Sequence, residues 1–207
     1  MDCAGSENKM KIPKVIFYYS TIYDEVLSGK PNNYKRTENA YKAQRKFQKY
    51  WDNKERKILT TMSKISGFKW HSEKIVCYLS YFAPFSYSAP LTLKIRDRKG
   101  FMFTLLVHEL CHVLYVSNKK KMISPKTKKG IYKKYSKERF NTLLHLSVEA
   151  LLKLTIEKVF KKDAEKYLKY ERTWEFFPKT KRGLTYKRSW EIMVKEGPEN
   201  ILKEAIK

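Results

Sequence analysis

The chain of 207 residues is poor in several residue types, and each shortage excludes a class of protein. Its 3 Cys are odd in number and far apart, which argues against a disulfide-built fold and fits a reducing cytoplasm. With only 7 Gly and 7 Pro, the chain is neither fibrous nor of low complexity. No run approaches the roughly 18 consecutive apolar residues of a membrane span, and no apolar segment follows the first residues. We therefore expect neither a secretion signal nor a membrane anchor.

Acidic residues are also scarce, with 21 Asp and Glu against 45 Lys and Arg, so the formal net charge is +24. Such a charge is typical of proteins that contact the phosphates of nucleic acids. A lysine-rich surface is also typical of hyperthermophile proteins, although Glu is then abundant as well. Basic charge can finally steer acidic substrates toward a site. The composition leaves these three interpretations open.

Histidine is rare too, with only 4 in the chain, yet two of them form the pentad His108-Glu109-Leu110-Cys111-His112. On a helix, residues four apart share a face, so His108 and His112 can bind one metal ion. Glu109 then reaches a neighbouring water molecule rather than the metal, which is how zinc peptidases activate water. Cys111 points away from this face. The pentad predicts a zinc site with Glu109 as general base and acid.

A catalytic zinc site usually has a third protein ligand. Tyr115 and Asn118 occupy the positions where the metzincin class requires Gly and His, so that class is excluded. Two candidates remain further along, His145 and Glu149, which share a helix face. An unpaired carboxylate is costly to bury, so the apolar surroundings of Glu149 favour a ligand, with an ion pair to Lys153 as the alternative. His145 is either the alternative ligand or a residue that orients a ligand.

The hydrophobic pattern predicts an alternation of strands and long helices. Strands are expected at residues 14–20, 73–82 and 91–95, and the last is expected to be an edge strand that pairs with substrate. Long helices are expected at residues 36–65, 98–116 and 137–160. Shorter helices are expected within 186–205, with a break at Gly197-Pro198. Asp97 is the expected N-cap of the metal-binding helix.

One segment is strongly basic. Between Lys119 and Arg139 lie ten Lys or Arg and a single acidic residue, Glu138, with Pro125 and Gly130 in the middle. We expect a solvated, mobile loop there. It is also the segment through which we expect any non-specific contact with nucleic acid.

The metal-binding helix, a connecting segment and a helix carrying Glu149 in a Val-Glu-Ala context together resemble the gluzincin metallopeptidases. In that clan a second, "glutamate" helix supplies the third zinc ligand. The small single-domain archaeal minigluzincins are similar. The resemblance implies zinc bound by His108, His112 and Glu149, with Glu109 as general base and acid, and hydrolysis of a peptide or protein substrate.

The resemblance covers residues 70–160 and implies an α+β, zincin-like fold, with a small mixed sheet, long helices, and the metal-binding helix followed by the glutamate helix. Residues 1–207 are expected to form a single catalytic domain, with 161–207 as a C-terminal helical appendage or a pro-segment. Two departures stand out. The 36 residues between His112 and Glu149 form a long spacer, and Lys153 replaces an acidic residue, which leaves open which carboxylate orients a ligand histidine.

Three rival functions remain. A DNA-associated protease of the SprT kind would use His145 as its third ligand and the basic charge to hold DNA, although 32 residues between His112 and His145 is a long separation for that family and a Cys-rich zinc ribbon is lacking. A non-catalytic binding protein would use the zinc only to hold its fold together. A latent enzyme would have its cleft blocked by residues 186–207.

Overall fold

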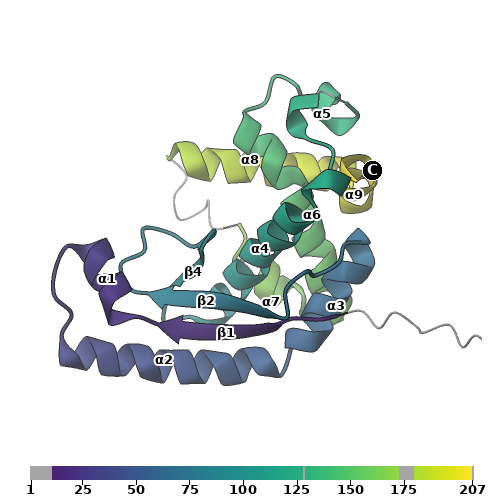
Figure 1. The fold of residues 1–207 in the computed structure, drawn as a ribbon. Coiled ribbons are helices and arrows are strands. Elements are labelled where there is room, and N and C mark those ends of the chain that lie inside the picture. The colour runs from purple at the N-terminus through teal and green to yellow at the C-terminus, as the bar shows by residue number, and fades with distance from the viewer. Residues whose placement is uncertain (1–10, 128, 173–179, 207) are drawn as a thin grey trace, which may run out of the picture.

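The computed structural model describes residues 11–127, 129–172 and 180–206, which form a small sheet and a larger set of helices (Figure 1). The strands are β1 (Lys14–Tyr19), β2 (Lys74–Ser80), β3 (Tyr87–Ser88) and β4 (Leu91–Lys94). The α-helices are α1 (Thr21–Ser28), α2 (Tyr34–Asp52), α3 (Glu55–Ser66), α4 (Lys99–Ser117), α5 (Ile131–Lys134), α6 (Phe140–Phe160), α7 (Glu165–Leu168), α8 (Lys181–Glu196) and α9 (Pro198–Ala205). Short 3-10 turns are η1 (Lys119–Lys121), η2 (Pro125–Thr127) and η3 (Lys161–Asp163).

The four strands form one mixed sheet in the order β1-β2-β4-β3. β1 and β4 both run parallel to β2, and β3 pairs antiparallel with β4. A mixed α+β structure with a small mixed sheet is therefore confirmed. The expectation that β4 is the edge strand is wrong, because the chain between Pro84 and Pro90 forms β3 and pairs with the outer side of β4.

The sheet is buried on one face. Along β1 and β2 the side chains alternate, so that Phe17 and Cys77 are buried while Tyr18 and Val76 are 49% and 40% exposed. This alternation is typical of a sheet with one face on the core and one toward solvent. Helices α2, α3 and α4 contribute Trp51, Met62 and Phe103, among others, to the core on the buried side.

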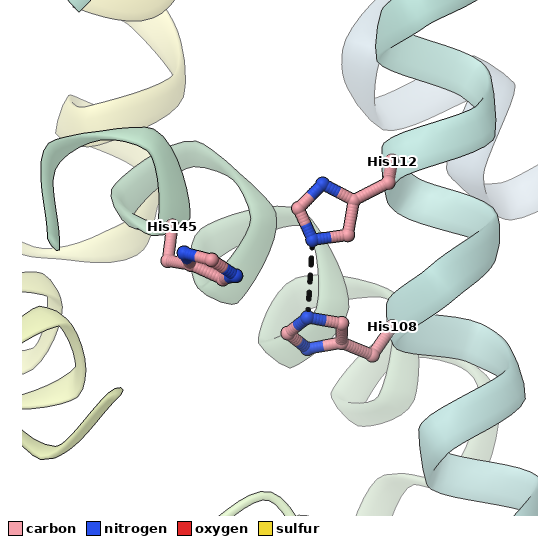
Figure 2. A group of neighbouring side chains, drawn as sticks. All are labelled: His108, His112 and His145. Carbon is pink, nitrogen blue, oxygen red and sulfur yellow. Dashed lines mark hydrogen bonds between the residues drawn. The ribbon is translucent and has the colours of Figure 1, made fainter. Parts of the chain in front are cut away.

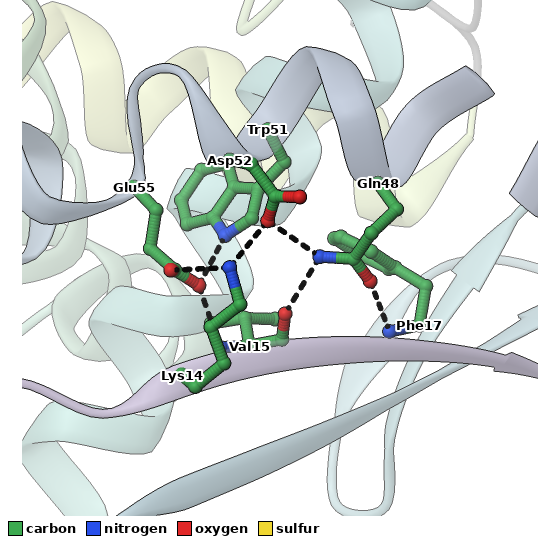
Figure 3. A network of polar contacts seen from close by, with 7 residues as sticks. All are labelled: Lys14, Val15, Phe17, Gln48, Trp51, Asp52 and Glu55. Carbon is green, nitrogen blue, oxygen red and sulfur yellow. Dashed lines mark hydrogen bonds and ion pairs between the residues drawn. The ribbon is translucent and has the colours of Figure 1, made fainter. Parts of the chain in front are cut away.

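Polar side chains of α2 and α3 cover the free edge of β1 (Figure 3). Glu55 Oε1 accepts from the Val15 backbone N–H at 2.6 Å, and Gln48 Oε1 accepts from that of Phe17 at 3.0 Å. Gln48 Nε2 donates back to the Val15 carbonyl at 3.1 Å. A bare strand edge can pair with another chain, and these side chains occupy the groups that would do so. Lys14 adds ion pairs to Asp52 and Glu55 at 2.5 and 3.0 Å.

The same network divides the long helix expected over residues 36–65. α2 ends at Asp52 and α3 begins at Glu55, with no Gly or Pro between them. Both of these carboxylates pair with Lys14 of β1, and Glu55 also accepts from Trp51 Nε1 at 2.9 Å. The helix is thus interrupted where its side chains contact β1, and not at a Gly or Pro. The local sequence therefore gives little indication of the interruption.

Two apolar helices, α4 and α6, lie at the centre of the helical part (Figure 1). α4 has the length and hydropathy of a membrane-crossing helix, but 61% of that window is buried inside the protein, as in many core helices. Its N-cap is Arg98, without a side-chain cap bond, so the expected Asp97 cap is wrong. α6 contacts α3 and α4 as well as α8 and α9 from the C-terminal part.

The described part of residues 161–206 shares the core of the rest of the chain. Leu168, Trp190, Met193 and Ile201 are all buried within it. The predicted break at Gly197-Pro198 is confirmed, because α8 ends at Glu196 and α9 begins at Pro198.

The basic segment forms short helical elements in its described part, where a loop without secondary structure was expected. It forms η1, η2 and α5, and Ile131 and Tyr132 are buried. The Ile123 backbone N–H donates to the Ala205 carbonyl at 2.9 Å, which ties the segment to α9. The buried side chains of Ile131 and Tyr132 anchor the segment to the core, although its ten cations make it look fully solvated in the sequence.

Candidate metal centre

Three of the four histidines meet where α4 and α6 face each other (Figure 2). His108 and His112, one helical turn apart on α4, place their Nε2 atoms 3.2 Å from each other. His145 of α6 points toward them, and one ring nitrogen of each histidine lies within 4.8 Å of the others. The helical spacing that predicted a shared face for His108 and His112 is confirmed by this contact.

The imidazoles of His108 and His145 are held by hydrogen bonds on the side away from this meeting point. His145 Nδ1 is 2.7 Å from the Asn141 carbonyl, which can only accept, so Nδ1 carries the proton. His108 Nδ1 lies 2.6 Å from a carboxylate oxygen of Glu171. In a neutral ring, protonation of Nδ1 leaves the Nε2 lone pair available to a metal ion.

These residues fit a metal ion of zinc size. Zinc binds histidine nitrogen at about 2.0–2.1 Å with tetrahedral geometry, so two ligand nitrogens should lie about 3.3 Å apart. The 3.2 Å between the Nε2 atoms of His108 and His112 is close to that separation. The protein thus has buried His and Glu groups able to hold a metal ion.

Glu171 is a site residue that the sequence analysis did not single out. It follows α7, is 5% exposed, and bonds a histidine 63 positions earlier in the chain. Burial alone would lower the pKa of His108, but Glu171, together with the nearby Glu109 and Glu149, raises it to about 10. The same negative field favours a divalent cation. Glu171 is also the carboxylate that orients His108, which the sequence left open.

Glu149 lies deeper, on the Glu171 side of His108. It is completely buried, and neither of its oxygens has a hydrogen-bond partner among the described residues. One of its oxygens lies within 4.8 Å of ligand atoms of His108 and Glu171, in a group that does not include His112. Burial and the charge of Glu171 raise the pKa of Glu149 well above its usual range, against a lowering effect of His108.

The alternative ion pair of Glu149 is wrong, because Lys153 pairs with Glu157 instead. His145 and Glu149 do lie on the same face of α6, as their spacing predicts, but they reach different sides of His108. His145 faces the Nε2 side, which it shares with His112, and Glu149 faces the side of Glu171. The four-residue spacing of His145 and Glu149 therefore cannot predict which of the two lies beside His112, because that depends on how α6 packs against α4.

Glu109 is buried beside the histidines, at 6% exposure. Its negative charge contributes to raising the pKa of His108 and, after burial, that of the Cys77 thiol on β2. Glu109 is therefore within electrostatic reach of both the metal centre and the sheet. Cys111 is fully buried and belongs to neither of the candidate ligand groups of the described residues, in agreement with its expected role in packing.

A cleft of about 630 Å³ opens beside His145. Besides His145, it is lined by Phe85, Arg139, Phe140, Asn141, Thr185 and Tyr186. The ring of Tyr186 lies 4.5 Å from that of His145 and 5.8 Å from that of His108, measured between centroids. α8, which belongs to the segment considered as an appendage or pro-segment, thus forms one wall of the cleft.

No family model, no curated protein and no solved structure matches this chain. The function is therefore inferred from the geometry and chemistry of the centre itself.

Proposed function

We propose that the protein is a zinc-dependent metallopeptidase in which His108, His112 and His145 hold the metal and Glu109 is the general base and acid. The observation that carries the proposal is the meeting of three imidazoles, with two Nε2 atoms 3.2 Å apart, beside an adjacent buried carboxylate. His145 takes the place that the gluzincin resemblance gives to Glu149. A zincin-like arrangement of the sheet, α4 and α6 is part of the same proposal.

The chain's own residues account for the proton transfers and the orientation of the site. When bound, zinc would polarise the scissile carbonyl and acidify the attacking water. Glu109 accepts the proton of that water as its oxygen bonds to the carbonyl carbon, and delivers it to the nitrogen as the C–N bond breaks. Glu171 and the Asn141 carbonyl fix the ring orientation of His108 and His145 through their Nδ1 atoms.

Tyr186 is the tyrosine that we assign to stabilise the negative charge that develops on the carbonyl oxygen. Its ring contacts those of His145 and His108 and lines the cleft. A hydroxyl placed there would donate to the oxyanion. Tyr186→Phe should lower kcat on the order of 10²-fold while zinc content stays unchanged. A variant with unchanged kcat would remove this role from Tyr186.

A DNA-associated protease of the SprT kind is the second candidate, because His145 rather than Glu149 joins the two histidines of α4. The role of Glu109 is the same in both candidates. They differ in whether DNA stimulates hydrolysis of a protein substrate at low salt, where contacts to phosphates are strong. Casein hydrolysis measured with and without duplex DNA distinguishes them: stimulation favours the second candidate, and equal rates favour the first.

The central experiment measures zinc content and casein hydrolysis on the same purified variants. Glu109→Gln should retain zinc and lose turnover by roughly 10²–10⁴-fold. His145→Ala should lose zinc, whereas His71→Ala, which removes the exposed fourth histidine, is the matched control and should retain it. Glu149→Gln should keep its zinc. An empty site in Glu149→Gln with a full site in His145→Ala would restore the gluzincin ligand set and overturn ours.

A further inference from the structure

The described lining of the cleft beside His145 combines exposed aromatic rings with one cationic side chain, Arg139. Phe85 and Phe140 line it and are 47% and 48% exposed, although side chains of their size are usually buried. Thr185 and His145, at 8% and 9% exposure, form its more buried part. The apolar surface lies next to the candidate metal centre, where a substrate side chain adjoining the scissile bond would be placed.

Arg139 supplies the charge of the cleft. It is exposed, and among the described residues no carboxylate pairs with it, whereas its neighbour Glu138 pairs with Arg188 at 2.7 Å. None of the seven lining residues is acidic. Arg139 is also the N-cap of the 21-residue helix α6, whose first N–H groups add to the positive potential. An anionic group of a ligand would therefore be stabilised at this position.

We infer that the cleft selects peptide substrates in which an acidic residue adjoins a large apolar one, a specificity that rests on the proposed peptidase function. The apolar side chain packs against Phe85 and Phe140, and the acidic side chain pairs with Arg139. A single-stranded nucleic acid would also combine aromatic and cationic contacts, but it needs cations repeated along its backbone. Among the described residues that line the cleft, Arg139 is the one Lys or Arg, which matches one carboxylate better than a row of phosphates.

The test measures binding rather than turnover, so that it does not depend on catalysis. Zinc-loaded Glu109→Gln protein is titrated into fluorescent short peptides that differ only at the central pair: Phe-Glu, Phe-Gln and Ala-Glu. Phe-Glu should bind about 5-fold more tightly than Phe-Gln, as expected of one partly solvated ion pair. It should bind about 10-fold more tightly than Ala-Glu, because the ring is buried on binding. Circular dichroism checks that each protein variant is folded.

Charge variants then assign the preference to one residue. In the Glu109→Gln background, Arg139→Gln should make the affinities for the Phe-Glu and Phe-Gln peptides equal. Arg139→Glu in the same background should make Phe-Gln the tighter-binding peptide. Arg45→Gln is the matched control, since Arg45 is exposed on α2, outside the cleft lining, and its loss changes the net charge equally. The control should leave the 5-fold preference intact. If the Arg45 and Arg139 variants lost the preference for Phe-Glu equally, the preference would come from the overall charge, and the inference would be overturned.

The remaining outcomes separate this inference from the proposed function. Hydrolysis by the wild type with no difference between Phe-Glu and Phe-Gln overturns the specificity and leaves the peptidase intact. If the binding preference depends on Arg139 but no zinc-loaded wild-type preparation hydrolyses peptides, the ligand preference of the cleft is supported and the proposed peptidase function is contradicted. Displacement of the peptide by oligo-dT, lost in the Arg139 variant but not in the Arg45 variant, would assign the cleft to nucleic acid and overturn the inference.

Discussion

Two clusters of buried polar groups in this protein differ in how their hydrogen-bonding capacity is met. At the edge of β1, Glu55 accepts from a backbone N–H and from an indole N–H, and pairs with Lys14 (Figure 3). Between α4 and α6, Glu149 is completely buried, yet neither of its oxygens has a hydrogen-bond partner among the described residues. Both residues are glutamates inside the fold, but only one has its partners.

We interpret the difference as one between a structural network and the proposed metal centre. A buried polar group without a partner costs free energy, so such groups are rare unless a ligand or a special protonation state accounts for them. The Glu55 network is complete and joins a helix break to a strand edge. The histidine cluster consists of two groups that share His108: one with His112 and His145, and one with the carboxylates Glu149 and Glu171. A raised pKa, which favours the uncharged carboxyl, accounts for Glu149, and the three imidazoles are able to hold a metal ion.

Metal removal should produce the largest difference between the clusters. At free zinc about 1,000-fold above its dissociation constant, binding stabilises the folded state by about 4 kcal/mol. Chelation should therefore lower the free energy of unfolding by that amount, measured by urea titration with and without chelator. The shift should persist in a Glu55 variant and vanish in His145→Ala. An identical urea midpoint in both conditions would contradict the metal site.

The same substitution in both clusters sharpens the comparison. Glu55→Gln should lower the free energy of unfolding by about 1–3 kcal/mol, because an amide nitrogen then faces donors that the carboxylate satisfied. Zinc content should be unaffected. Urea titration in the presence of chelator isolates this effect from metal binding. A loss below the error of the titration would mean that Val15 and Trp51 find other acceptors.

Glu149→Gln should have a smaller effect, within about 1 kcal/mol in the chelated protein. Burial and the charge of Glu171 raise the pKa of Glu149 well above its usual range, which favours the protonated, uncharged form of its side chain. A neutral amide of nearly the same shape replaces it without removing a charge or a hydrogen bond. A destabilisation larger than that of Glu55→Gln would show that Glu149 has a partner essential for folding.

The smallest effect concerns pH, at the Glu55 cluster. Partial burial would raise the pKa of Asp52, but hydrogen bonds from Lys14 and Gln48 outweigh it and lower the pKa. A carboxyl whose pKa is lowered by folding stabilises the protein above its unfolded value of about 3.9, and this contribution is lost as the pH falls. Asp52→Asn should therefore be less stable than wild type at pH 7, with the difference shrinking below about pH 4. Urea titrations at both pH values measure it, and a constant difference would contradict the shift.

Much of the local structure could be predicted from the sequence. Runs rich in β-branched and aromatic residues predicted β1 and β2, and helical spacing predicted α6 and the shared face of His108 and His112 on α4. The broken pair of C-terminal helices followed from Gly197 and Pro198. These features depend on neighbours within a few residues, where periodicity and turn chemistry are sufficient.

Other features depend on contacts between distant segments. The break between α2 and α3 depends on Lys14, and the edge position of β3 depends on its pairing with β4. The bond between Glu171 and His108 joins residues 63 positions apart, with no motif around Glu171 to reveal it. A local pattern contains no information about such pairings, because they arise only when separate elements pack.

The third ligand shows where the two kinds of information meet. The sequence by itself determined that His145 and Glu149 share one face of a helix and that one of them should reach His108 and His112. Only the packing of α6 against α4 decided which of them does so. It brings a ring nitrogen of His145 within 4.8 Å of His108 and His112, and it leaves Glu149 beside His108 and Glu171. Residue spacing determines which face of a helix a side chain lies on. The position of one helix along another is set by the packing of the whole core.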